Sequence, residues 1–209
     1  MKITAVFFKA VLAGIAIAIG GTVYLAMENK VLGAVLFATG LCVICTQGLF
    51  LYTGKIGYLT SQEKKDVPGY LIQLLVTFIG NYTGTILVGL YVGSGQWKTI
   101  AEAAAKTAAG KAEKPLWVLF IAGILCGILV YAAVDGYKKT KSLWIIVFCI
   151  AAFILCGYEH CVADMFYFAA AGVWSLKAVL VILAAACGNS VGSIIMNQVI
   201  SMKESRTLT

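Results

Sequence analysis

Six long stretches of this chain carry no charged side chain, and their length limits what the chain can fold into. A helix needs about 20 residues to cross the hydrocarbon core of a bilayer, so each stretch is long enough, or nearly so, for one crossing. With 61% hydrophobic and only 12% charged residues, the chain carries more apolar surface than a soluble domain can bury. The sequence therefore predicts an all-α integral membrane protein, with lipid as its solvent and one domain over residues 1–209. The six stretches are 10–27, 31–54, 67–97, 115–134, 142–158 and 178–202.

The basic residues predict the orientation of the chain. Six crossings put both termini on the same side of the membrane, and Lys and Arg near the ends of spans are retained in the cytoplasm. With the termini inside, ten of the sixteen basic residues lie on the inner side. We therefore expect a multi-pass protein of a prokaryotic cytoplasmic membrane with both termini cytoplasmic. The formal charge of +7 does not indicate a nucleic-acid partner, because the basic residues are scattered between apolar runs.

The seven cysteines predict no disulfide framework and no cofactor. They lie in apolar surroundings and their number is odd, which argues against paired disulfides. Cys42 and Cys45 form a CxxC pair, but no histidine is near, and we interpret both as small packing residues. No metal site is expected.

A short motif occurs twice and predicts an internal repeat. The sequence GNYTG at 80–84 reappears as GNSVG at 188–192, with an offset of 189 − 81 = 108 residues between the asparagines. Each copy falls in the third span of a three-span half, about 1–95 and 115–205, and an odd number of crossings makes the halves inverted. The Ala-rich loop 97–115, with charges at helical spacing, is expected to join them as an interfacial helix on the outer face.

Polar residues interrupt the second and fifth spans and predict that both helices are broken. Thr53 and Gly54 lie in one interruption, and Glu159 and His160 lie in the other. Lipid cannot satisfy the backbone groups that a break releases, so two such breaks indicate a cavity or pore between them. We expect Glu159 to cap the half-helix that follows its break.

Four segments together resemble the formate/nitrite transporter family: LYTG at 51–54, GNYTG, GYEHCVADMF at 157–166 and GNSVG. The resemblance covers nearly the whole chain, and Glu-His followed by Ala-Asp-Met-Phe is its most specific element. It implies an aquaporin-like protomer with six transmembrane helices, assembled as a homopentamer, that passes a small monovalent weak-acid anion and is not an enzyme. Formate is the first expectation, and nitrite or hydrosulfide follows. Small-residue faces at Gly14, Gly20, Gly21 and Gly33 also favour close packing between helices of an oligomer.

The resemblance assigns roles to individual residues. It implies that His160 faces the pore centre, that Thr53 lies in the broken second span and that Lys111 stands in the outer vestibule. It further implies pore-lining asparagines at Asn81 and Asn189, and apolar constrictions at Leu51, Tyr52 and Phe153. Two positions depart from the family pattern: no acidic residue precedes Leu51, and Asp164 stands where asparagine is frequent.

These residues predict a mechanism with one open step. Lys111 draws the anion in, and the apolar slit disfavours a bare ion, which loses its hydration there, relative to its conjugate acid. His160 then either exchanges a proton with the substrate or only donates a hydrogen bond.

Two other functions remain as alternatives. An aquaporin-like pore for water or small neutral solutes has a compatible fold, although the paired Asn-Pro-Ala breaks are missing from this sequence. A membrane-embedded hydrolase would use Glu159 and His160 with a metal, but a zinc site needs three or four ligands and the chain has one histidine.

Overall fold

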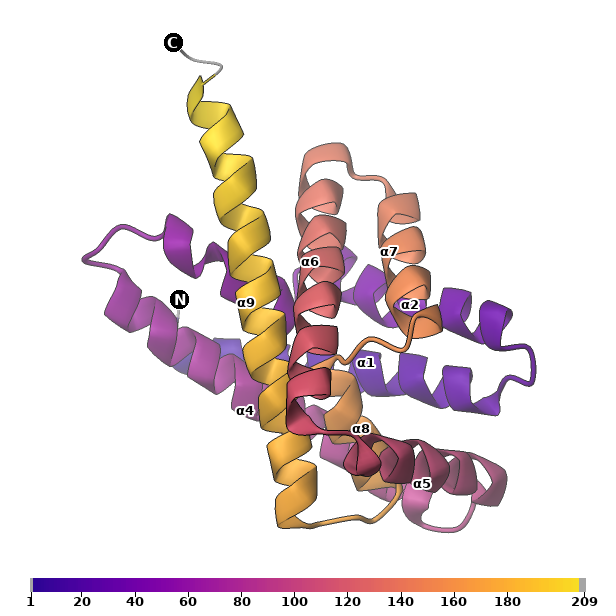
Figure 1. Ribbon diagram of the computed structural model, residues 1–209. Coiled ribbons are helices and arrows are strands. Elements are labelled where there is room, and N and C mark those ends of the chain that lie inside the picture. The colour runs from indigo at the N-terminus through magenta and orange to yellow at the C-terminus, as the bar shows by residue number, and fades with distance from the viewer. Residues whose placement is uncertain (1, 207–209) are drawn as a thin grey trace.

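The computed structural model describes residues 2–206, and all of their regular elements are helices (Figure 1). In the order of the chain these are α1 (Ile3–Ala26), α2 (Lys30–Gln47), α3 (Tyr52–Lys55), the 3-10 helix η1 (Ile56–Ser61), α4 (Val67–Gly93), α5 (Lys98–Glu113), α6 (Leu116–Thr140), α7 (Leu143–Leu155), α8 (Cys161–Ala170) and α9 (Leu176–Arg206). The predicted all-helical class is confirmed for this part of the chain.

Five helices are long and apolar enough to cross a membrane: α1, α2, α4, α6 and α9. The fifth predicted span differs, because its helix α7 has only 13 residues and is followed by the 10-residue helix α8. Large apolar side chains point outward from α7, where Trp144 is 69% exposed and Phe148 67% exposed. Such an apolar outer surface is expected for helices that face lipid or other subunits rather than water.

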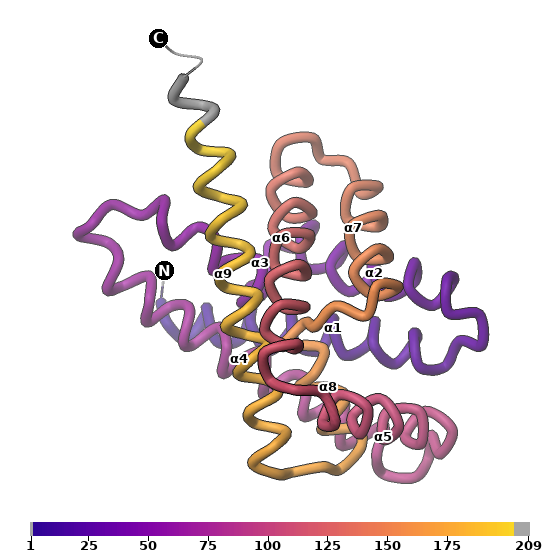
Figure 2. The backbone as a smooth tube through the Cα atoms, in the orientation of Figure 1, coloured from indigo at the N-terminus to yellow at the C-terminus, as the bar shows by residue number. Residues whose placement is uncertain are grey.

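Two links without helical structure interrupt the chain, one between α2 and α3 and one between α7 and α8. Gly48 ends α2 with a φ of 61°, and residues 49–51 continue without helix until α3 begins. Gly157 follows α7 with a φ of 68°, and residues 158–160 lead to α8. Glycine takes up this left-handed conformation without a steric cost, which explains why each helix stops where it does. Figure 2 shows the link between α7 and α8 as an uncoiled orange stretch near the centre of the molecule.

The repeated GNxxG motif brings two pairs of helices into close contact. Its last glycine is Gly84 in α4 and Gly192 in α9. A methyl group on Gly84 would overlap the backbone oxygen of Val11 in α1, and one on Gly192 would overlap that of Ile124 in α6. The pairs α1–α4 and α6–α9 therefore cross through equivalent glycines, so that the backbones meet without intervening side chains.

The small-residue faces predicted for subunit contacts are used inside the protomer instead. Gly14 lies against the backbone of Asn81, and Gly20 lies against that of Phe37. Gly21 contacts the ring of Phe166, and Gly33 contacts Tyr24 and Met27. These glycines shape the helix pairs within one chain, so they are not a basis for predicting an oligomer.

The Ala-rich segment forms α5, as predicted. Ile100, Ala104 and Ala108 are buried at intervals of four residues, which gives the helix one apolar face. This helix packs against α8 and α4, and Figure 1 shows it beside α8 at one end of the molecule. The packing brings the charged end of α5 close to the link before α8.

Candidate functional site

Asn189 holds the link between α7 and α8 in place. Its side chain is fully buried, and its amide nitrogen donates to the backbone oxygens of Gly123 at 2.9 Å and Glu159 at 2.8 Å. Its side-chain oxygen accepts the backbone N–H of Cys161 at 3.0 Å. One asparagine thus satisfies the backbone on both sides of His160, as buried polar groups require.

Asn81 makes the same three kinds of bond at the other link. Its amide nitrogen donates to the backbone oxygens of Ala10 and Phe50, both at 2.8 Å, and its oxygen accepts the N–H of Tyr52 at 2.9 Å. The residue that it brackets is Leu51. By this hydrogen-bond pattern, Leu51 and His160 hold corresponding positions relative to the two asparagines. Both asparagines bind backbone groups of the links.

His160 lies at the centre of the site and touches Thr53. Its ring is buried, and its Nε2 lies 2.8 Å from the Thr53 hydroxyl oxygen. Its Nδ1 accepts the backbone N–H of Ala163 at 3.2 Å, so His160 is the N-terminal cap of α8. Because Nδ1 is an acceptor, the hydrogen-bond network places the ring proton on Nε2, which donates to Thr53. The hydroxyl hydrogen of Thr53 is then free to donate to another acceptor.

Glu159 does not cap α8, which corrects the expectation from sequence. Its carboxylate is fully buried and pairs with two lysines of the α5 segment, Lys111 and Lys114, the latter at 2.9 Å. Lys111 also pairs with Asp164 at 2.8 Å. A buried carboxylate needs such a partner to offset the loss of hydration. The cap was assigned to Glu159 because the sequence does not show which way a side chain points after a break.

Lys111 remains charged in this setting. Burial works to lower the pKa of its ammonium, but the carboxylates of Asp164 and Glu159 outweigh burial and hold that pKa above its usual value. Its charge is therefore matched by fixed carboxylates, and it differs from a solvated lysine on an exposed helix face.

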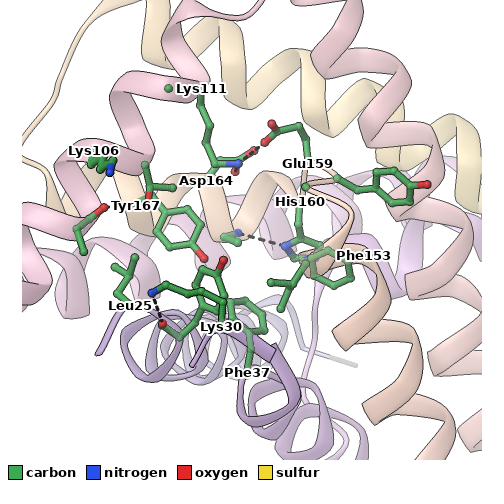
Figure 3. Close-up of a pocket in the computed structure, with 18 of the residues that line it drawn as sticks. Leu25, Lys30, Phe37, Lys106, Lys111, Phe153, Glu159, His160, Asp164 and Tyr167 are labelled. Carbon is green, nitrogen blue, oxygen red and sulfur yellow. Dashed lines mark hydrogen bonds and ion pairs between the residues drawn. The ribbon is translucent and has the colours of Figure 1, made fainter. Parts of the chain in front are cut away.

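A cavity of about 630 Å³ opens above these residues, and we call it the Lys111 cavity (Figure 3). Phe153 and His160 lie at its base, where the two rings stack with centroids 5.7 Å apart, and Phe37 meets Phe153 edge-on at 6.2 Å. Its charged lining consists of the four lysines Lys30, Lys106, Lys111 and Lys114 and the two carboxylates Glu159 and Asp164.

A second cavity of about 200 Å³ lies beyond the other link, and we call it the Lys55 cavity. Leu51, two residues before Thr53, and Gly54, directly after it, line this cavity. The hydrogen bond between Thr53 and His160 therefore joins the two cavities. His160 lines the Lys111 cavity, and Thr53 directly precedes Gly54, which lines the Lys55 cavity. The other residues that line the Lys55 cavity are Ile44, Cys45, Gly48, Leu49, Phe50, Lys55, Val134, Tyr137, Lys138 and Lys141.

Tyr52 takes a different place from the other predicted constriction residues. Tyr52 lines neither the Lys111 cavity nor the Lys55 cavity. Its hydroxyl lies 2.9 Å from that of Ser190, and its ring meets Phe78 edge-on at 5.1 Å. Leu51 and Phe153, in contrast, each line one of the two cavities.

The sequence reading missed several residues that the structure brings to the site. Lys114 joins Lys111 on Glu159, and their spacing of three residues on one helix was a usable signal. Lys55 directly follows the LYTG motif and lines the second cavity. No group of three histidine, cysteine or acidic side chains able to hold a metal occurs in the described part of the chain.

Comparison with known proteins supports this description. A family model described as "Formate/nitrite transporter" matches residues 1–202. The nitrite transporter NirC of Salmonella typhimurium is 33% identical over 151 residues, covering 66% of this chain and 55% of that protein. The formate channel FocA of Haemophilus influenzae is 27% identical over 152 residues, covering 66% of this chain and 52% of that protein. The matches thus span about half the length of these curated relatives.

The fold is also found among solved structures. A structure titled "Pentameric formate channel with formate bound" superposes with a TM-score of 0.82 at 22% identity, covering 99% of this chain and 98% of that chain. An "FNT family ion channel" superposes with a TM-score of 0.80 at 24% identity, covering 96% and 89%. At this level of identity the likeness concerns the fold.

Proposed function

This chain belongs to the formate/nitrite transporter family, and we propose that it passes small monovalent weak-acid anions through the centre of its own protomer. Relatives of this family are named as transporters and channels rather than enzymes. Formate is the first expected substrate, and nitrite and hydrosulfide are the next.

The observation that carries the proposal is the excess of positive charge in both cavities. Four lysines face two carboxylates in the Lys111 cavity. Three lysines line the Lys55 cavity, and no carboxylate among the described residues does so. A cleft lined by one sign of charge raises the local concentration of the opposite ion, so both mouths favour anions over cations.

Between the cavities the proposed path runs past apolar side chains and one polar contact. Phe153 lines one cavity and Leu51 the other, and the contact between Thr53 and His160 supplies polar atoms between them. An ion that leaves its hydration shell here needs hydrogen bonds from the protein. The free hydroxyl hydrogen of Thr53 and the Nε2–H of His160 are the two donors in reach.

We propose that His160 supplies a hydrogen bond rather than a proton. Its Nε2–H is the only ring proton, and losing it to the anion would leave an imidazolate. A donated proton must first be gained at Nδ1, which accepts the N–H of Ala163 and caps α8. Proton exchange through this ring therefore requires that the hydrogen bond from the Ala163 N–H to Nδ1 breaks first.

We further propose six crossings arranged as two inverted halves. The equivalent bonds of Asn81 and Asn189 and the equivalent glycines Gly84 and Gly192 support the repeat. The helices α2 and α3 together form the second crossing, and α7 and α8 form the fifth. The basic residues favour cytoplasmic termini, which makes the Lys111 cavity the outer one and the Lys55 cavity the inner one. A homopentamer is proposed from the pentameric relative and the exposed apolar side chains.

The test is anion flux into liposomes that contain the purified protein. We expect flux of formate and nitrite that exceeds that of gluconate and disappears in protein-free liposomes. Hydrosulfide is measured in parallel, and water permeability is followed in a sorbitol gradient. Water flow without anion flux would support a pore for water or neutral solutes and overturn the proposal, as would equal flux of sodium and formate.

A further inference from the structure

The Lys55 cavity gathers lysines from three elements. Lys55 ends α3, Lys138 and Lys141 come from the end of α6, and Lys9 approaches from α1. Within the described residues none of these four lysines forms an ion pair. The carboxylate of Asp135 pairs with Lys139 at 3.1 Å and accepts the Tyr58 hydroxyl at 3.1 Å.

Lys55 is the least compensated charge of this group. It is only partly exposed, and its ammonium sits 3.7 Å from the centroid of the Phe50 ring. Lys9 lies 5.6 Å from the centroid of the same ring, so two positive charges lie near one aromatic ring. Lys111, on the other side of the site, has two carboxylate partners, whereas Lys55 has none within the described residues. A partly desolvated cation without a counterion is stabilised by any anion that can reach it.

We propose that the Lys55 cavity is a binding site for one small monovalent anion, held by the ammonium of Lys55 between Lys138 and Lys141. Its volume of about 200 Å³ leaves room for such an ion together with a few waters, each of which takes about 30 Å³. The apolar side chains of Leu49, Phe50 and Leu51 form the rest of its wall. The inference rests on the proposed function for the identity of the natural occupant, but not for the existence of the site.

The other groups around Lys55 supply no counterion to it. Cys45 and Tyr137 line the same cavity, and Tyr70 of α4 donates its hydroxyl to the backbone oxygen of Lys55 at 2.8 Å. The cluster of Tyr58 and Asp135 faces Lys138 rather than Lys55, with the Lys138 ammonium 3.6 Å from the Tyr58 ring centroid.

The experiment combines direct binding with flux. Crystals of the full chain grown in bromide at pH 7 are expected to show an anomalous peak within about 3.5 Å of the Lys55 ammonium. The peak should be absent in Lys55→Gln and retained in Lys55→Arg. In liposomes, Lys55→Gln should raise the half-saturating formate concentration at least about tenfold for entry from the Lys55 side, since hydrogen bonds to charged groups contribute this much. Lys64→Gln, which removes an exposed charge outside the cavity, is the matched control.

The outcomes separate this inference from the proposed function. Anion flux without a bromide peak at Lys55, and with the same half-saturation in Lys55→Gln as in Lys64→Gln, would overturn the binding site alone. A bromide peak at Lys55 in a protein that passes no formate or nitrite would support the site and overturn the proposed function. Peaks that follow exposed lysines such as Lys64 and spare Lys55 would mark adventitious ions only, and the inference would be wrong.

Discussion

Replacing Asn189 by alanine should destabilise the protein by more than the usual effect of one side chain. The substitution removes all three hydrogen bonds of a fully buried amide. The oxygen of Glu159 lies in a link without helix, and the N–H of Cys161 is one of the first-turn donors that a helix leaves unpaired. Both backbone groups therefore lose a partner that the fold does not replace.

The magnitude follows from these two groups. A buried backbone group without a partner costs about 1–3 kcal/mol, which gives about 2–6 kcal/mol for the pair. Hydrogen bonds between membrane helices average only about 0.6 kcal/mol each, so the three bonds set a lower bound of about 2 kcal/mol. Asn81→Ala should cost a similar amount, because Asn81 makes the same pattern of bonds at the other link.

The assay is the free energy of unfolding in mixed micelles, titrated with denaturing detergent at one fixed protein concentration. Asn29→Ala is the matched control, since Asn29 caps α2 at an exposed site and its loss should cost about 1 kcal/mol. The reasoning is refuted if Asn189→Ala and Asn81→Ala destabilise the protein no more than Asn29→Ala does.

Two pairs of substitutions and one single substitution test the helix crossings, the centre of the proposed path and the Lys111 cavity. Gly192→Ala should lower the unfolding midpoint, because the added methyl group overlaps α6. Gly110→Ala in α5, where the methyl group meets open space, should raise the stability by about 0.5–1 kcal/mol. A loss of stability in both variants would contradict the close-contact argument. His160→Asn should change the anion selectivity measured in liposomes. If His160 only donates a hydrogen bond, the anion flux of this variant should depend on pH between 5 and 8 as that of the wild type does. A pH profile that changes with the substitution would establish proton exchange. Lys111→Gln should destabilise the protein by about 3–5 kcal/mol, because it removes a partner from two buried carboxylates. Lys106→Gln should leave the unfolding midpoint unchanged and lower anion uptake mainly at low salt. Equal effects of the two substitutions on stability would contradict the ion-pair assignment.

Sequence reasoning succeeded where the length of an uncharged run decides the structure. Uncharged runs of about 20 residues are helices because only a helix satisfies its backbone within lipid, and α1, α4, α6 and α9 were predicted on that basis. The GNxxG motifs also carried more than a pattern match. Their glycines let helix backbones meet, and their asparagines bind the backbone of the links.

The sequence was less informative wherever the chain leaves a helix. After Gly48 and Gly157 adopt positive φ, the direction of the following side chains no longer follows from helical spacing. The family resemblance implied a constriction that includes Leu51 and Tyr52, but it did not show that the ring of Tyr52 lies against Phe78. For the same reason the cap of α8 was assigned to Glu159 instead of His160. Ion pairs across elements, such as that of Lys111 with Asp164, depend on these directions and were not predicted.

The lysines of the site fall into two groups that suit different tasks in an anion path. Lys111 and Lys114 are bound to buried carboxylates, so an anion near His160 meets a field that is already largely balanced. Lys55, Lys30 and Lys106 have no carboxylate partner within the described residues and line the two cavities. A path that conducts must attract an ion at its mouths without holding it tightly in the middle. In the path that we propose, unpaired charge in the cavities and paired charge near the Thr53–His160 contact meet both conditions, which gives the two buried carboxylates a role in a chain with an excess of lysine.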